Sequence, residues 1–259
     1  MKINTTIRLG LGVFAALCLQ ISSNLYGASY LYQDDFSANA GALNGRATAS
    51  GFGAWTADSA FQVGSDKITI NSNTPDYNKA TFALPTLGAS DTLSLSITVR
   101  PSGSLFTGFG FTSGSDQYVS NNGFNWIYFA SGNPTIQFLR GQGPTGLNYS
   151  AALTDPALDF NASLPTTFEY TYSASAKTLS LLASNGGKSS TLLNNLDVST
   201  TPLSGYSNFA LMFQGQELGT SSNPAYVDNL SISIIPEPST FSMLLCGLGA
   251  MTAIYRRRR

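Results

Sequence analysis

The chain has 259 residues and a formal net charge of −1, and charged side chains make up only 10% of it, against about 25% in an average soluble protein. It has two cysteines and no histidine, so a Ser-His-Asp triad, a Cys-His pair and any zinc site with histidine ligands are excluded within it. This composition is typical of an exported all-β protein rather than of a cytosolic enzyme or a nucleic-acid binder.

The N-terminal residues 1–27 have the three parts of a secretory signal peptide. Lys2 and Arg8 supply the positive charge, residues 9–19 (LGLGVFAALCL) are apolar, and small residues lead to a cleavage site near Gly27 or Ala28. An apolar run of this length without amphipathic periodicity suits export better than the alternative, a buried N-terminal helix. We therefore expect export through the Sec translocon and removal of this segment by signal peptidase.

The body of the chain, residues 28–235, predicts one antiparallel β-sandwich domain. Apolar and polar residues alternate in segments such as 93–100 and 168–172, which is typical of strands with one face in a core. Asn185-Gly186-Gly187 supplies the residues that a tight hairpin needs. No segment of the body has a sustained helical period. Further strands are expected at residues 30–36, 61–63, 67–71, 79–84, 106–112, 125–130, 135–140, 209–214 and 226–234.

The net charge of the body indicates which partners it can bind, and the positions of the cysteines indicate how it is stabilised. It contains 7 basic and 13 acidic residues, for a net charge of −6. This disfavours DNA, RNA and anionic lipid surfaces as partners, and we predict no nucleic-acid binding. Cys18 and Cys246 both lie outside the body, so its stability has to come from core burial and sheet hydrogen bonds rather than from disulfides.

Residues 106–129 are rich in aromatic side chains interleaved with asparagine. Sugar rings stack on aromatic faces and amides bond sugar hydroxyls, so this mixture is the expected lining of a glycan site. Simple alternation places Phe124, Trp126 and Tyr128 on one face of a strand, with Asn125 beside them. We identify these four residues as candidates for glycan binding. The alternative is that the aromatic face packs into the core.

The acidic residues give little support to catalysis. Glycoside hydrolysis needs two carboxylates on opposite sides of the scissile bond. The only glutamates of the body, Glu169 and Glu217, are far apart in sequence, and Pro156 marks a loop between Asp155 and Asp159. We predict no catalytic residue. A hydrolase or lyase that uses aspartates to act on glycans is the alternative, and a purely structural surface protein is a third hypothesis.

Three aspartates form a candidate structural calcium site, because Ca²⁺ takes oxygen ligands and needs neither histidine nor cysteine. Asp34 is two residues after Tyr32, and Asp228 is two residues before Leu230, so in a strand each aspartate shares a face with that apolar residue. If those faces are buried, desolvation of each carboxylate is costly. If the terminal strands pair, these two aspartates and Asp35 could converge on one ion. The alternative is a set of hydrogen-bonded aspartates that cap strands.

The C-terminal segment, residues 236–259, has three parts. Pro236, Glu237 and Pro238 form a stiff extended stub with the carboxylate outward, because proline cannot join regular helix or sheet pairing. Residues 241–255 are apolar and would make a helix of about 22 Å, short for a bilayer core of about 30 Å. A cytoplasmic stop signal follows, made of Arg256, Arg257, Arg258 and Arg259.

This arrangement resembles the PEP-CTERM sorting signal of Gram-negative bacteria. The resemblance implies that exosortase, a membrane protease or transpeptidase, recognises the Pro-Glu-Pro element and removes the apolar tail. It also implies an organism that makes exopolysaccharide, a transient anchor in the inner membrane, and a final place in the cell envelope or extracellular matrix. An ordinary C-terminal membrane anchor is the alternative.

The body resembles the concanavalin A-like and laminin-G-like sandwich domains. The segments that carry this resemblance are Asp34-Asp35-Phe36, Leu43-Asn44-Gly45-Arg46, Trp55 and Val227-Asp228-Asn229-Leu230. The resemblance implies a jelly roll of two antiparallel sheets with adjacent terminal strands. The Glu-x-Asp-x-x-Glu pattern of the glucanase relatives is absent, so our leading hypothesis is a non-enzymatic exported protein that binds exopolysaccharide.

Overall fold

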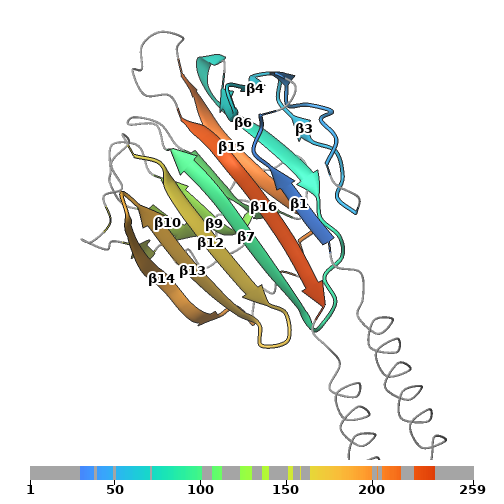
Figure 1. Cartoon of the computed structure of the whole chain (residues 1–259), viewed down its shortest axis with the longest axis vertical. Coiled ribbons are helices and arrows are strands. Elements are labelled where there is room, and N and C mark those ends of the chain that lie inside the picture. The colour runs from blue at the N-terminus through green and yellow to red at the C-terminus, as the bar shows by residue number, and fades with distance from the viewer. Residues whose placement is uncertain are drawn as a thin grey trace, which may run out of the picture. The chain divides into compact units, whose positions relative to one another are not determined.

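The described strands of the computed structural model form two antiparallel sheets (Figure 1). None of the described residues lies in an α-helix, and none forms a helix long and apolar enough to cross a membrane. The all-β prediction is therefore confirmed. The structure describes residues 30–37, 40–48, 51–70, 72–100, 107–112, 123–129, 136–139, 151–153, 158, 164–199, 203, 206–216 and 225–236.

The larger sheet contains nine strands among these residues. The terminal strand β1 also belongs to it and pairs with β16. The order of the others is β14 (Lys188–Asp197), β13 (Thr178–Asn185), β12 (Thr166–Ser173), β7 (Asp91–Arg100), β16 (Tyr226–Pro236), β5 (Lys67–Ile70), β4 (Phe61–Gly64) and β2 (Gly41–Ala42), and β1 is Tyr30–Asp34.

The smaller sheet contains seven strands within the described ranges. For β9, β10 and β11 only the backbone is described. The order is β11 (Ala151–Leu153), β10 (Ile136–Leu139), β9 (Gly123–Phe129), β8 (Thr107–Thr112), β15 (Asn208–Gln216), β6 (Ser72–Ala83) and β3 (Thr56–Ala57).

The core lies between the two sheets, and aromatic side chains join them. Phe109 of β8 packs on Phe168 of β12 with ring centroids 5.4 Å apart, and Phe111 packs on Tyr170 at 5.3 Å. All four side chains are almost fully buried. The rings of both pairs are tilted, at 53° and 49°, and such aromatic contacts add to the free energy gained by burial. The expected β-sandwich is confirmed by this face-to-face packing.

Strict alternation explains why the central strands fit this core. In β7 the buried residues are Leu93, Leu95, Ile97 and Val99, and the residues between them are partly exposed. β12 and β13 show the same period of two residues. Since successive side chains of a strand point to opposite faces, one face of each strand joins the core and the other faces outward.

The two terminal strands lie side by side (Figure 1). β1 pairs with β16 in antiparallel register from Tyr30, opposite Ile234, to Asp34, opposite Leu230. The first and the last residue of this pairing are therefore neighbours, so the chain enters and leaves the sandwich at one end. Residues Tyr30–Ile234 form one compact unit, and the adjacency implied by the resemblance is present.

Candidate functional site

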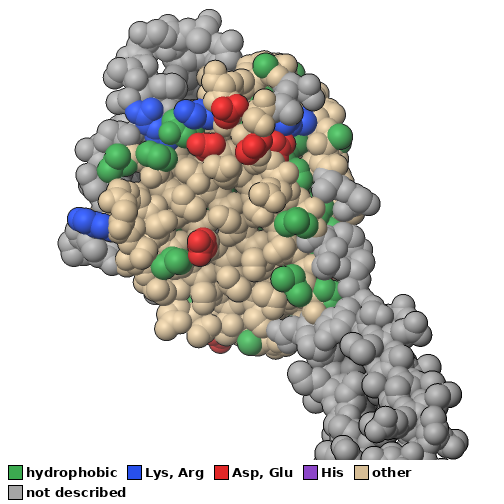
Figure 2. All heavy atoms as spheres, viewed as in Figure 1, with side chains coloured by type: hydrophobic (Ala, Val, Ile, Leu, Met, Phe, Trp, Pro, Cys, Tyr) green, Lys and Arg blue, Asp and Glu red, His purple; other side chains and the backbone are tan. Residues whose placement is uncertain are grey.

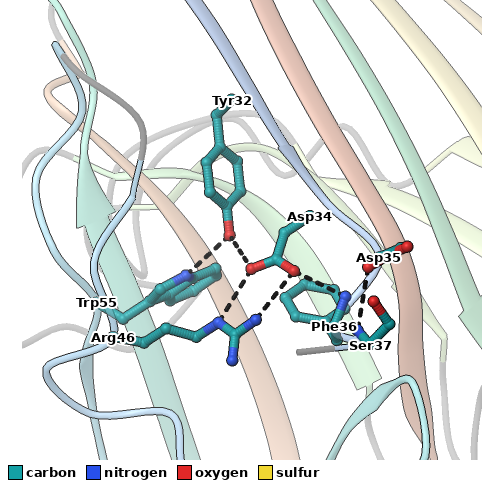
Figure 3. A network of polar contacts seen from close by, with 7 residues as sticks. All are labelled: Tyr32, Asp34, Asp35, Phe36, Ser37, Arg46 and Trp55. Atoms are coloured by element: carbon teal, nitrogen blue, oxygen red, sulfur yellow. Dashed lines mark hydrogen bonds and ion pairs between the residues drawn. The ribbon is translucent and has the colours of Figure 1, made fainter. Parts of the chain in front are cut away.

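A network of polar contacts joins the end of β1 to the loop that follows β2 (Figure 3). β1 ends at Asp34, and Phe36 has a φ of 57°, so the chain turns sharply just after the strand. The backbone N–H of Phe36 donates to Asp34 Oδ1 at 2.7 Å. Asp34 therefore caps the strand with a local side-chain to backbone bond, as aspartate does at many turns.

The centre of this network is the ion pair between Arg46 and Asp34. Arg46 Nε donates to Asp34 Oδ2 at 3.0 Å, and Nη2 donates to Oδ1 at 3.1 Å. The two side chains are 15% and 14% exposed. The guanidinium also lies 5.8 Å from the ring centroid of Phe36. This two-point contact fixes the orientation of the Asp34 carboxylate and also compensates its charge, whereas a lysine could only compensate the charge.

Backbone bonds hold Arg46 in place. Its N–H donates to the carbonyl of Leu43 at 3.1 Å, and its own carbonyl accepts from the N–H of Trp55 at 3.0 Å. Gly45, with a φ of 78°, donates to the carbonyl of Trp55 at 2.8 Å. The Leu43–Arg46 turn and Trp55 therefore form one unit, and this unit aims the guanidinium at β1.

Tyr32 links the ion pair to the core. Trp55 Nε1 donates to Tyr32 Oη at 3.1 Å, and the Tyr32 hydroxyl donates to Asp34 Oδ2 at 3.3 Å. Both ring systems are buried. Burial raises the pKa of Tyr32 well above its ordinary value of about 10, because the phenolate would lose its solvation. The phenol is thus a neutral link between Trp55 and the carboxylate.

This arrangement stabilises the fold, and its polar groups bond mainly to one another. The carboxylate of Asp34 already receives bonds from Arg46, Phe36 and Tyr32. Asp35 is exposed, and the hydrogen bonds that it accepts from Ser37 lower its pKa. Across the described ranges no three acidic or cysteine side chains gather as metal ligands would. Asp34 thus has the hydrogen bonds of a strand-capping aspartate, and the calcium site at Asp34, Asp35 and Asp228 stays a prediction.

The parity argument for Asp228 is wrong. Val227 and Leu230 are buried, whereas Asp228 is only partly buried and Asn229 is exposed. The alternation changes phase at this point because β16 changes partner, from β5 at residues 226–227 to β1 at residues 230–234. The carboxylate of Asp228 is therefore not on the continuation of the core face, and its Oδ1 accepts from Asn229 Nδ2 at 3.3 Å.

The candidate glycan residues lie on β9, which the structure describes by its backbone. They are Phe124, Asn125, Trp126 and Tyr128. In β8, Phe109 pairs with Ile127 and Phe111 pairs with Phe124, so three steps along β9 match two along β8. This register shift interrupts the strict alternation that predicted one shared face for these residues. Their role in glycan binding stays a prediction.

The other acidic candidates do not form a pair. Glu169 is exposed on β12, and its cross-strand neighbours are Ser96 and Leu182 rather than a second carboxylate. Asp155, Asp159 and Glu217 lie outside the described residues.

Arg46 was not predicted to be the partner of Asp34. Twelve residues separate the two in sequence, and neither spacing nor alternation points to such a pair. The small number of basic residues is the one signal that could have pointed to Arg46. The body has only seven of them, and a partly buried acidic residue needs one nearby.

The C-terminal end of β16 leads directly into the candidate sorting segment. Pro236 is the last residue of the strand, and Glu237, Pro238 and the arginines at 256–259 lie outside the described residues, as do residues 1–27. Residues 235–259 match the family of the PEP-CTERM protein-sorting motif. The chain carries a PEP-CTERM motif. The resemblance of the C-terminal segment is confirmed.

Solved structures similar to this PEP-CTERM chain include lectins and a glucanase. Peanut lectin has 11% identity and a TM-score of 0.49, with 80% of this chain and 98% of the lectin covered. The carbohydrate recognition domain of Emp47p has 14% identity and a TM-score of 0.46, with 82% and 96% covered. Endo-1,3-β-glucanase from Streptomyces sioyaensis has 13% identity and a TM-score of 0.49, with 82% and 97% covered. No curated protein sequence matches the chain.

Proposed function

We propose that this protein is a non-enzymatic, exported envelope protein that exosortase processes at its PEP-CTERM motif and whose sandwich binds exopolysaccharide. The observation that carries this proposal is the position of the motif, which starts at residue 235, at the very end of β16. Of the described strand residues, only Ile235 and Pro236, the last two of β16, fall within the motif, so removal of the tail after them leaves the described strands in place.

The N-terminal end supports the same route. β1 begins at Tyr30, just after the expected cleavage site at Gly27 or Ala28. Tyr30 pairs with Ile234, so the leader and the tail join the sandwich at the same end. A domain of this kind is translocated through the Sec translocon after its leader, and it is held at the inner membrane by its tail until exosortase acts.

Glycan binding is proposed for the aromatic strand β9. On the neighbouring strand β8, Gly108 and Gly110 alternate with the core residues Phe109 and Phe111, so they lie on the opposite face of the sheet, where they too are buried. Tyr128 pairs with Gly108 across the two strands. An aromatic side chain such as that of Tyr128 offers a stacking face to a pyranose ring. Amides such as that of Asn125 would bond its hydroxyls.

The sorting proposal is tested by the mass of the protein in its native envelope. We expect the wild type to lack the C-terminal arginines, and the triple variant Pro236→Ala, Glu237→Gln, Pro238→Ala to keep Arg259 and stay in the inner membrane. Arg256→Gln serves as a matched control, because it changes the tail and leaves the recognition element intact. A wild-type protein that retains Arg259 would contradict processing.

The glycan proposal is tested by affinity electrophoresis in gels that contain soluble polysaccharides, with the full chain in a detergent that has no sugar headgroup. We expect retardation of the wild type, weaker retardation of Trp126→Ala, and recovery for Trp126→Phe, because phenylalanine keeps a stacking face. Trp126→Ala must retain the wild-type melting temperature, since a core tryptophan would cost about 3 to 5 kcal/mol. Release of reducing sugar would instead support the enzyme hypothesis.

A further inference from the structure

The outer face of the larger sheet carries hydroxyl side chains in register across three strands. β12 lies between β7 and β13, and its outward residues pair directly with theirs. Two rows of three hydroxyls that cross these strands are Ser184, Thr167 and Thr98, and Ser180, Thr171 and Ser94. A third row runs through Ser173 at the end of β12.

The spacing of these rows is set by sheet geometry. Successive outward residues of one strand are about 7 Å apart, and neighbouring strands are about 4.8 Å apart. The hydroxyl-bearing residues therefore form a regular grid, in which Ser180 Oγ already bonds Asn195 and Ser173 Oγ bonds Ser175. Thr98 Oγ1 and Thr167 Oγ1 lie 2.9 Å apart and bond to one another, which shows that side chains in a row are close enough to bind one ligand together.

This grid carries little charge. Among the outward residues of 92–98, 167–173 and 178–184, Glu169 is the only ionisable side chain, and Leu182 is the only large apolar one. Figure 2, which views the molecule as Figure 1 does, shows most Lys, Arg, Asp and Glu side chains toward the top, one basic side chain at the left edge, and few charges over the middle. Natural sheets commonly carry charged side chains such as lysine and glutamate, which oppose association with other chains. This face has few of them.

The composition of the face does not fit a protein partner. The centres of protein interfaces are enriched in Tyr, Trp, Phe, Met and Arg and depleted in Ser. The three hydroxyl rows contain none of the enriched types. A second copy of the chain bound here would bury many hydroxyls and little apolar area, so the cost of desolvating the hydroxyls would not be offset.

The composition does fit an uncharged polymer of sugars. Each hydroxyl both donates and accepts, as each sugar hydroxyl does. One such bond contributes little in water, so only a chain that meets several rows at once would bind well. The carboxylate of Glu169 accepts bonds from sugar hydroxyls but repels the carboxylates of acidic polysaccharides.

We propose that the outer hydroxyl face of β7, β12 and β13 binds neutral polysaccharide chains along its rows of serine and threonine. This inference rests on the proposed binding of exopolysaccharide, but it uses the opposite sheet from β9. It therefore names a second surface and a class of glycan, extended and uncharged.

The test uses affinity electrophoresis of the full chain, in a detergent without a sugar headgroup, with hydroxyethyl cellulose as the neutral polymer and alginate as the acidic one. The variant Thr98→Val, Thr167→Val, Thr171→Val removes three hydroxyls and keeps β-branched side chains of the same shape. Thr56→Val, on the exposed end strand β3 of the other sheet, is the matched control. Melting temperatures verify that each variant is folded.

We expect the wild type to be retarded by the neutral polymer and not by alginate, and monosaccharides to compete poorly. The triple variant should lose affinity at least about tenfold, because each lost bond contributes a part of the total, and Thr56→Val should bind as the wild type does. In a second variant, Glu169→Gln, retardation by alginate should rise relative to the neutral polymer, since the repelling charge is gone.

Four results would overturn the inference, the last of them together with the proposed function. Unchanged binding by the folded triple variant would show that the rows are not used. Equal retardation of the wild type by both polymers would contradict the preference for neutral chains. Loss of all binding in Trp126→Ala alone would assign the glycan to β9, so the proposed function would stand without this face. A wild type retarded by no polysaccharide would instead reject both proposals.

Discussion

Arg46 holds both carboxylate oxygens of Asp34, with Nε to Oδ2 at 3.0 Å and Nη2 to Oδ1 at 3.1 Å, across twelve residues of sequence (Figure 3). This contact ties the end of the first strand to the loop after β2. Tyr32 and Trp55 extend the same network into the core. One ion pair and the two hydrogen bonds of the Tyr32 hydroxyl therefore connect the first strand to this loop and to the core.

Replacement of Arg46 by glutamine should lower the free energy of unfolding by about 2 kcal/mol. The reason is that Asp34 would keep its charge in a site that is only 14% exposed, without the cation that compensates it. Arg46→Lys should recover part of the loss, because an ammonium keeps the charge but not the two-point contact. Urea unfolding of the full chain in detergent measures both.

Lys188→Gln is the matched control for charge removal, because Lys188 is exposed at the start of β14. It should change the free energy of unfolding by less than about 0.5 kcal/mol. Equal losses for Arg46→Gln and Lys188→Gln would mean that the ion pair contributes nothing beyond net charge.

Stability should fall in alkali, and Tyr32 should account for part of the fall. Burial raises the pKa of this phenol in the folded protein above the value of about 10 in the unfolded chain. The folded state thus holds the proton more tightly. The contribution is fully present below about pH 10 and is lost as the pH rises further, at up to about 1.4 kcal/mol per pH unit. Tyr172, whose pKa burial also raises, adds to the effect.

Tyr32→Phe should therefore show a shallower loss of stability above about pH 10 than the wild type does. At neutral pH it should be less stable by about 1 kcal/mol, since Trp55 Nε1 and Asp34 each lose a bond. Urea unfolding at a series of pH values gives both quantities. An identical alkaline slope in the two proteins would exclude Tyr32 as a source of the pH dependence.

Calcium should have no effect on melting if Asp34 belongs to the ion pair. Its oxygens are already bonded to Arg46 and to the Phe36 backbone, so a cation would have to displace the guanidinium. Calorimetry of the full chain in detergent, with excess calcium and then with EDTA, measures this. We expect equal melting temperatures. A rise with calcium that EDTA reverses would support the calcium site at Asp34, Asp35 and Asp228 instead.

Alternation predicted the strands that bury one full face. It located β7 and β12 because their buried residues follow a strict period of two. It did not locate β14, the edge strand at Lys188–Asp197, in which Leu193 is the only buried residue. An edge strand needs one partner and little burial, so its sequence carries almost no periodic signal.

Only those features of the candidate site that depend on neighbouring residues in the sequence could be predicted. The parity of Asp34 with Tyr32 correctly indicated a partly buried carboxylate at the end of β1. The same argument failed at Asp228, because β16 exchanges one partner strand for another there. Such an exchange depends on how distant strands meet, and local periodicity does not record it. Arg46 was missed for the same reason.

Two hairpins with the same turn geometry offer a last test. The β13–β14 turn has Gly186 and Gly187 at φ values of 54° and 78°, and the β4–β5 turn has Ser65 and Asp66 at 52° and 62°. L-residues pay a backbone penalty in this left-handed region and glycine does not. A Cβ on Gly187 would meet nothing within 4 Å, so only the backbone term would change there.

Gly187→Ala should thus destabilise the protein by about 1 kcal/mol, and Asp66→Gly should stabilise it by a similar amount. Gly64→Ala is the control, because a Cβ there also meets nothing within 4 Å but the backbone is not left-handed. It should leave stability unchanged or raise it by a few tenths of a kcal/mol, since alanine restricts the unfolded chain. Equal effects of alanine at positions 187 and 64, measured by urea unfolding, would show that the left-handed turn does not set the preference for glycine.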